Sequence, residues 1–152
     1  QCLADAWYDD KQLAYIRRHE DTQQMIQEYF EDKHAFISDM TDGSSDRIIV
    51  SRSILYFAHY DQETDKIVKD KELGKFFALS TAGRYKSLQY PKIKNLVFEE
   101  VLTNEEPFLP GEANKLYNLY STISRSDPET KMYLISNLVS PSNPYSDAWG
   151  IR

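Results

Sequence analysis

The sequence predicts an α/β fold, in which a mainly parallel sheet is flanked by helices and carries an antiparallel β insertion around residues 47–79. Two apolar runs, NLVFE at 95–99 and KMYLIS at 131–136, have the composition of buried strands, and a helical pattern over 110–124 lies between them. A strand, a helix and a second strand in this order form a parallel pair with a crossover helix. The residues between 47 and 79 form short strand-like runs joined by turns.

The N-terminal elements are short. Residues 1–8 read as the end of a helix, and the apolar run QLAYIR at 12–17 reads as a strand. Asp21 or Thr22 can cap a helix that continues to Phe30, because both side chains accept hydrogen bonds from free amide groups of a first helical turn.

The insertion and the C-terminal half have clearer signals. Strands are expected at 47–51, 53–60, 66–69 and 75–80, with a turn at 61–64. Pro110 and Gly111 open the helix that runs to about Ser124, with apolar residues at helical spacing. The run at 131–136 is expected to be a second buried strand that ends at Asn137.

Composition limits the class of protein. The 152 residues suffice for one compact domain, and 13% of them are aromatic, which supplies bulk for a core. A net charge of −6 argues against a cationic surface that binds nucleic acid non-specifically. The single Cys2 excludes an internal disulfide and a multi-cysteine zinc site, and indicates a reducing compartment such as the cytosol. No apolar run approaches 18 residues, so no membrane span is expected.

The sharpest chemical signal is the pair Glu99 and Glu100, which follows the apolar strand at 95–99. In open α/β sheets ligands bind at the carboxyl ends of the strands. Two acids there are typical of a Walker B motif, in which one acid holds the hydrated Mg²⁺ and the next polarises the water that attacks the γ-phosphate. The alternative is an apolar strand followed by an ordinary acidic loop, a common arrangement.

Four further residues have a structural interpretation, and two of them, Asn137 and Arg125, also have a functional one. Asn137 follows the next strand and can bond a phosphate or the attacking water, or it can cap the turn that follows. Arg125 ends the helix at 110–124, where a cation suits the helix dipole and where an arginine finger could also project. Arg17 and Arg18 follow the first strand, and their structural interpretation is a solvated strand end.

The glycines of this sequence do not form a phosphate-binding loop motif. The five glycines are not spaced as GxGxxG or GxxxxGK, the patterns that bind the phosphates of dinucleotides and nucleoside triphosphates. Any phosphate bound by these residues must therefore be held in another way.

Five segments along the chain form an ordered set: YIRRHE (15–20), KSLQYP (86–91), NLVFEEVL (95–102), FLPGEANKLYNLYSTISR (108–125) and LISNLVSPSNPYS (134–146). Together they resemble the DNA-packaging ATPases, or genome encapsidation proteins, of the phi-twenty-nine-type small tailed phages. The match is nearly continuous over 86–146 and patchy before it. The combination is much more specific than any one segment.

The resemblance implies a P-loop NTPase of the additional-strand (ASCE) type, in the translocase and terminase-like class. It implies an ATP hydrolase that uses ATP and Mg²⁺ to drive double-stranded DNA into a procapsid. Such a protein works as a homo-oligomeric ring, a pentamer by resemblance, at the portal vertex in the host cytoplasm. Residues 1–152 would then be a single, partial ATPase domain, with its Walker A loop before Gln1 and a nucleic-acid-contacting domain after Arg152.

The resemblance also implies roles for residues at the strand ends. Glu99, which stands where Asp is usual, would be the Walker B acid near Mg²⁺. Glu100 would be the catalytic glutamate, and Asn137 would occupy the sensor position.

The resemblance also implies roles for four basic residues. Arg125 would be an arginine finger that reaches into a neighbouring subunit's site, and Lys86 a second basic residue contributed across the subunit interface. Arg17 and Arg18 would lie near the nucleotide pocket.

Two other functions fit the same residues. In a non-catalytic α/β binding or assembly module, Glu99 and Glu100 would simply end a strand. A helicase-type P-loop NTPase would share the core but would not require the helix that ends in Arg125. A motor requires Glu99, Glu100 and Asn137 to converge at one side of the sheet.

Overall fold

The computed structural model describes residues 1–102, 106–136 and 143–150, which fold into two compact units. Unit 1 comprises Gln1–Ala14 and Asp21–Phe76, and unit 2 comprises Tyr15–Glu20 and Phe77–Arg152. Strands β1 (Gln12–Arg17) and β4 (Lys66–Ala78) each contribute residues to both units. No helix among the described residues is long and apolar enough to cross a membrane.

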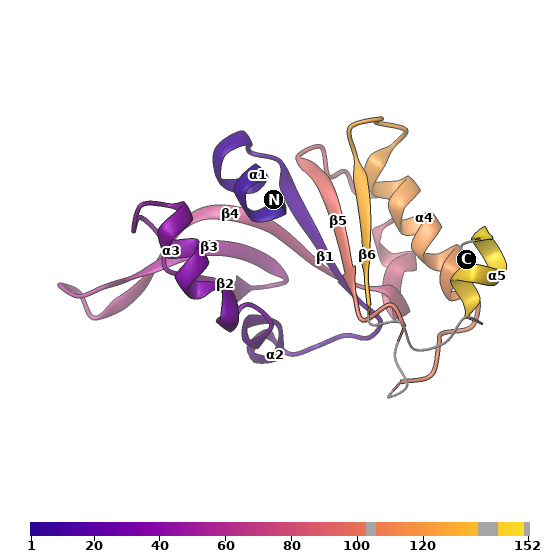
Figure 1. Cartoon of the computed structure of the whole chain (residues 1–152), viewed down its shortest axis with the longest axis horizontal. Helices are drawn as coiled ribbons and strands as arrows, with labels where there is room; N and C mark the ends of the chain where they lie inside the picture. The colour runs from indigo at the N-terminus through magenta and orange to yellow at the C-terminus, as the bar shows by residue number, and fades with distance from the viewer. Residues whose placement is uncertain (103–105, 137–142, 151–152) are drawn as a thin grey trace. The chain divides into compact units, whose positions relative to one another are not determined.

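Unit 1 contains the antiparallel insertion (Figure 1). Strand β2 (Arg47–Ser51) pairs antiparallel with β3 (Ile54–Asp61), and β3 pairs antiparallel with β4, in the order β2-β3-β4-β1. The unit's helices are short: α1 (Cys2–Asp9), α2 (Gln23–Glu28), η1 (Glu31–Lys33) and α3 (His34–Met40). Of the two caps that the sequence allows, Asp21 and Thr22, it is Thr22 that caps α2, by accepting a hydrogen bond from the amide of Met25 at 3.2 Å.

Unit 2 holds the parallel strands. Strand β5 (Ile93–Glu99) lies between β1 and β6 (Lys131–Ile135), and β5 and β6 are parallel, with Glu99 opposite Ile135 (Figure 1). Helix α4 (Glu112–Ser124) connects the two strands and buries its apolar face, which includes Leu116 and Leu119. The unit also contains the 3₁₀ segment η2 (Leu79–Tyr85) and helix α5 (Pro144–Trp149).

The structure confirms the α/β class, the antiparallel insertion and the parallel pair with its crossover helix. The sheet as a whole is mixed, because the insertion supplies two antiparallel pairs. Two expectations about single strands are wrong. The runs 66–69 and 75–80 are not separate strands, because a single strand, β4, continues through the polar residues between them. Strand β6 is not buried, because it lies at the end of the strand order, and Ile135 is 49% exposed. Residues 34–40 and 79–85 form helical segments that periodicity did not indicate.

Gly74 lets β4 approach β1 closely. A Cβ atom at this position would lie 1.8 Å from the carbonyl oxygen of Leu13, far inside van der Waals contact. Gly74→Ala is therefore expected to separate the two strands and to lower the free energy of unfolding by about 1–3 kcal/mol, the usual cost of overpacking. Urea denaturation followed by circular dichroism measures the change. Gly83→Ala is the matched control, since a Cβ there meets no atom within 4 Å. Equal stability of the two variants would contradict the close approach.

Candidate active site

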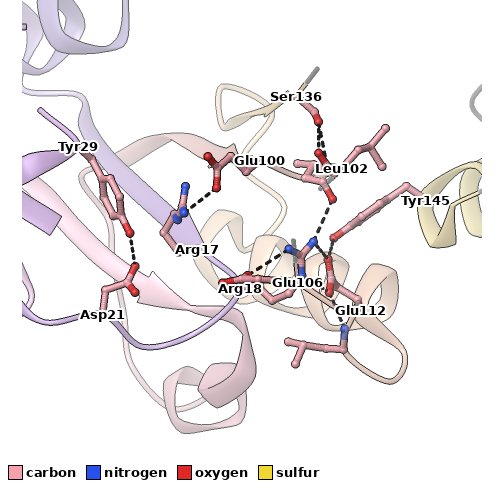
Figure 2. Close-up of polar contacts among 12 residues, drawn as sticks. Arg17, Arg18, Asp21, Tyr29, Glu100, Leu102, Glu106, Glu112, Ser136 and Tyr145 are labelled. Carbon is pink, nitrogen blue, oxygen red and sulfur yellow. Dashed lines mark hydrogen bonds and ion pairs between the residues drawn. The ribbon is translucent and has the colours of Figure 1, made fainter. Parts of the chain in front are cut away.

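The carboxyl ends of β1, β5 and β6 converge in unit 2 (Figure 2). Glu99 ends β5, and the guanidinium of Arg17, the last residue of β1, donates a hydrogen bond to Glu100 at 2.8 Å. Ser136, directly after β6, donates its hydroxyl proton to the carbonyl of Leu102 at 2.7 Å and accepts from the Leu102 amide at 3.0 Å. Two of the three positions expected to converge thus lie here, and the third, Asn137, lies outside the described residues.

The carboxylate of Glu99 is held from the neighbouring strand. The hydroxyl of Tyr15 on β1 donates a hydrogen bond to Glu99 at 2.5 Å, and the Tyr15 side chain is buried. The orientation of Glu99 is therefore fixed by the sheet itself. Tyr15 lay within a segment of the family resemblance, but its residue type gave no sign of this contact.

Glu100 leaves the strand in a different direction. Its backbone φ is 56°, in the left-handed region that residues other than glycine seldom occupy. Its side chain is 66% exposed and pairs with Arg17, which is only 16% exposed. The turn thus directs one acid, Glu99, against β1 and presents the next acid to solvent.

Arg18 is buried, so its interpretation as a solvated strand end is wrong. Its guanidinium donates two hydrogen bonds, at 2.7 and 2.8 Å, to the carboxylate of Glu112 in the first turn of α4, and a third to the carbonyl of Val101 at 3.0 Å (Figure 2). It also lies over the rings of Phe98 and Phe108, at 5.8 and 5.1 Å from their centroids. The side chains of Arg18 and Glu112 are 3% and 0% exposed.

The rest of the Glu112 carboxylate is also satisfied. It accepts hydrogen bonds from the Leu109 amide at 2.7 Å and from the hydroxyl of Tyr145 on α5. Burial of the guanidinium lowers the pKa of Arg18. The hydrogen bonds to Glu112 and the negative charge of the Glu112 carboxylate raise it by more, so the pKa of Arg18 lies above its usual value. Burial, together with the neighbouring Glu112 carboxylate, raises the pKa of Tyr145, so its hydroxyl remains a donor. No local pattern in the sequence indicates this cluster.

Arg125 and Lys86 lie away from the two acids. Arg125 caps the C-terminus of α4 with φ 45° and donates a hydrogen bond to the carbonyl of Leu88 at 3.2 Å. It lines a cavity of about 220 Å³ together with Ile93 and Lys94 at the start of β5. Because β5 rises about 3.3 Å per residue, Arg125 is roughly 20 Å from the strand's carboxyl end. Lys86 lies directly after η2, beside α4.

The acids suit a magnesium ion bound together with a phosphate. Mg²⁺ prefers oxygen ligands and is usually held by one or two carboxylates, substrate phosphates and water. Glu99 supplies one oriented carboxylate of this kind. Among residues 1–102, 106–136 and 143–150, no group of three His, Cys, Asp or Glu side chains could hold a metal by itself.

A family model of podovirus DNA encapsidation proteins (Gp16) matches residues 7–149. The chain belongs to this family. It is 25% identical over 137 residues to the DNA packaging proteins of Bacillus phages phi29 and PZA. That alignment covers 89% of this chain but 36% of each relative, so the chain spans about a third of the length of these curated relatives. The family predicted from the five segments is thus confirmed.

Solved structures agree on the fold. The N-terminal domain of the DNA packaging ATPase from bacteriophage phi29 superimposes with a TM-score of 0.75 at 24% identity, covering 98% of this chain and 69% of that one. A chain of the phi29 genome packaging motor assembly gives a TM-score of 0.72 at 23% identity, covering 97% and 40% of the two chains. The α/β architecture described above is therefore the fold of that N-terminal domain.

Glu112→Gln is expected to destabilise the protein strongly. The amide keeps the volume of the carboxylate but leaves the buried Arg18 charge uncompensated, which costs about 3–5 kcal/mol of unfolding free energy when a buried pair is broken. Glu106→Gln is the matched control, because the Glu106 carboxylate lies 3.6 Å from Arg18 and is 49% exposed. Its removal is expected to cost less than about 1 kcal/mol. Urea denaturation of both variants measures the difference, and equal losses would contradict the central role of Glu112.

Proposed function

We propose that this chain forms part of the ATPase domain of a motor that drives double-stranded DNA into a procapsid. The observation that carries the proposal is the pair Glu99 and Glu100 at the carboxyl end of β5, beside the ends of β1 and β6. Ligands of open α/β sheets bind at this side. Membership of the encapsidation family and the fold shared with a packaging ATPase domain support it. The proposed class is a P-loop NTPase of the additional-strand type, with residues 1–152 as one partial domain.

In this proposal Glu99 holds Mg²⁺, and its hydrogen bond from Tyr15 keeps one carboxylate oxygen oriented. When bound with ATP, Mg²⁺ neutralises charge on the β- and γ-phosphates. Residues 1–152 do not include a glycine-rich phosphate loop, since none of the five glycines has the required spacing. Asn137 serves as the sensor, and Arg17 and Arg18 border the nucleotide pocket. Arg18 does so indirectly, because its hydrogen bond to the Val101 carbonyl fixes the loop after β5.

Glu100 polarises the attacking water in this proposal. Its carboxylate faces solvent at the turn after β5, where water can reach it. Arg17 donates a hydrogen bond to this carboxylate at 2.8 Å and so holds it at the turn. The accessibility of Glu100 supports a role in general-base assistance.

Arg125 acts on a neighbouring subunit in this proposal. Its position at the opposite end of β5 prevents it from reaching the acids of its own chain. A homo-oligomeric ring, proposed as a pentamer at the portal vertex in the host cytoplasm, brings one subunit's α4 terminus to the next subunit's acids. Lys86 contributes a second positive charge across the same interface. The relatives named for DNA packaging and for a packaging motor assembly support these partners.

Glu100→Gln is expected to reduce ATP hydrolysis by the whole packaging protein by about two to four orders of magnitude. The amide keeps the size of the side chain but cannot polarise water as a carboxylate does. Binding of a fluorescent ATP analogue should persist, because the proposed metal-holding acid is intact. Hydrolysis at the parent rate would remove Glu100 from the mechanism.

The variant Glu99→Ala distinguishes the role of Glu99 from that of Glu100. Loss of the Glu99 carboxylate should weaken nucleotide binding only when Mg²⁺ is present, whereas Glu100→Gln should leave the magnesium dependence of nucleotide binding unchanged. If nucleotide binding depends on magnesium in the same way in the parent and in Glu99→Ala, Glu99 does not hold the metal and its role is only structural.

Arg125→Ala is expected to be inactive alone and to regain activity when mixed with Glu100→Gln. In a mixed ring, the intact acids of an Arg125→Ala subunit meet the intact guanidinium of a Glu100→Gln neighbour. An arginine finger contributes about 10³ to 10⁵ in rate, so even a few such interfaces are detectable in a steady-state assay. Inactivity of mixed rings whose composition has been verified, or full activity of Arg125→Ala alone, would contradict action in trans.

A further inference from the structure

A groove of about 220 Å³ lies in unit 2 between the end of η2 and one face of α4. Gly83 and Lys86 line one wall, and Lys115, Asn118 and Thr122 line the other. The last three residues recur at spacings of three and four, so they share one face of the helix. The groove is separate from the cluster around Arg18 and from the cavity beside Arg125.

The two segments that line the groove contain lysines and no acidic residue, although the chain as a whole carries a charge of −6. No acidic residue occurs between Leu73 and Phe98, a stretch of five Lys and Arg residues in which Arg84 pairs with Glu20 and Lys94 with Asp127. None occurs between Ala113 and Ser126 either. In the part of the chain that the structure describes, neither Lys86 nor Lys115 forms an ion pair with a carboxylate. Two lysines that form no such ion pair therefore line one small groove.

We propose that this groove binds a phosphate group, held between the ammonium groups of Lys86 and Lys115 and by the side-chain amide of Asn118. An ammonium group offers three donors and an amide two, and Lys and Asn are common side chains in contacts to phosphate oxygens. The hydroxyl of Thr122 donates to the carbonyl of Asn118 at 2.8 Å, which leaves the lysines and Asn118 as the donors. The small Gly83 leaves the groove open, since a Cβ there would meet no atom within 4 Å.

The size of the groove limits the ligand. Binding sites for whole small molecules usually exceed about 300 Å³, so the groove accepts a phosphate rather than a nucleoside. No aromatic side chain is among the described residues that line it, so a base would have no stacking partner. Both a nucleoside triphosphate and a nucleic-acid backbone carry such a phosphate. The proposal concerns binding alone and does not depend on hydrolysis at Glu100.

The test is a nuclear magnetic resonance titration of the chain with two probes, inorganic tripolyphosphate and a 12-base-pair DNA duplex. The side-chain amide of Asn118 is the reporter, because it lies in the groove. We expect its resonances to shift with at least one probe. In Lys115→Gln the affinity should fall about tenfold, the effect of losing one hydrogen bond to a charged group. Lys115→Arg should retain binding, because it keeps the charge.

Two further variants make the result specific to the groove. Gly83→Leu fills the space without disturbing the lysines and should abolish the shift. Lys131→Gln removes one exposed positive charge from β6 and should leave the affinity unchanged. A response to tripolyphosphate alone assigns the groove to a free polyphosphate, and a stronger response to the duplex assigns it to a nucleic-acid backbone. No shift of Asn118 with either probe, or equal affinity in Lys115→Gln and the parent, would overturn the proposal.

Discussion

The buried ion pair between Arg18 and Glu112 is the interaction on which the architecture of unit 2 depends. Both side chains are almost completely inaccessible to water, and the removal of two charges from water is costly unless each is fully paired. Here the guanidinium also bonds the Val101 carbonyl, and the carboxylate also accepts from Leu109 and Tyr145. The pair therefore joins the end of β1, the loop after β5, the start of α4 and helix α5. A displacement of β1 relative to α4 would leave both buried charges unpaired.

This constraint extends along α4. The ion pair fixes the helix at its first residue, Glu112, and the hydrogen bond from Arg125 to the Leu88 carbonyl fixes its C-terminal cap. A helix of 13 residues is about 20 Å long, which matches the length of β5. One rigid element thus connects the carboxyl ends of the strands with their opposite ends. In the proposed motor, the loop after Glu100 and the guanidinium offered to a neighbour are attached to the same helix.

The elements that could be predicted from the sequence are those whose formation depends on residues close together in the chain. The apolar run of β5, the helical spacing of α4 and the cap at Thr22 are patterns of neighbouring residues, and all three appear in the structure. The interpretation of Arg18 as a solvated strand end was wrong because its partner lies 94 residues away, so nothing beside it in the sequence indicates burial. Its proposed place near a nucleotide remains a prediction. The exposure of β6 was missed because an apolar run does not reveal whether its strand lies at the end of a sheet. Asn137 lies outside the described residues, so its place in the site remains a prediction.

The distribution of charge in unit 2 gives the proposed ring a physical basis. The acids Glu99 and Glu100 gather where β5 ends, whereas Arg125 lies where the strand begins, and Lys86 and Lys115 lie along the helix that spans this distance. Within one subunit Arg125 does not reach these acids, because β5 and α4 hold the two ends apart. In the proposed ring it reaches those of a neighbour, since head-to-tail contacts between copies close into a ring when the rotation between neighbours permits. In the proposed ring, the separation that keeps Arg125 away from the acids of its own chain allows it to act on those of a neighbour.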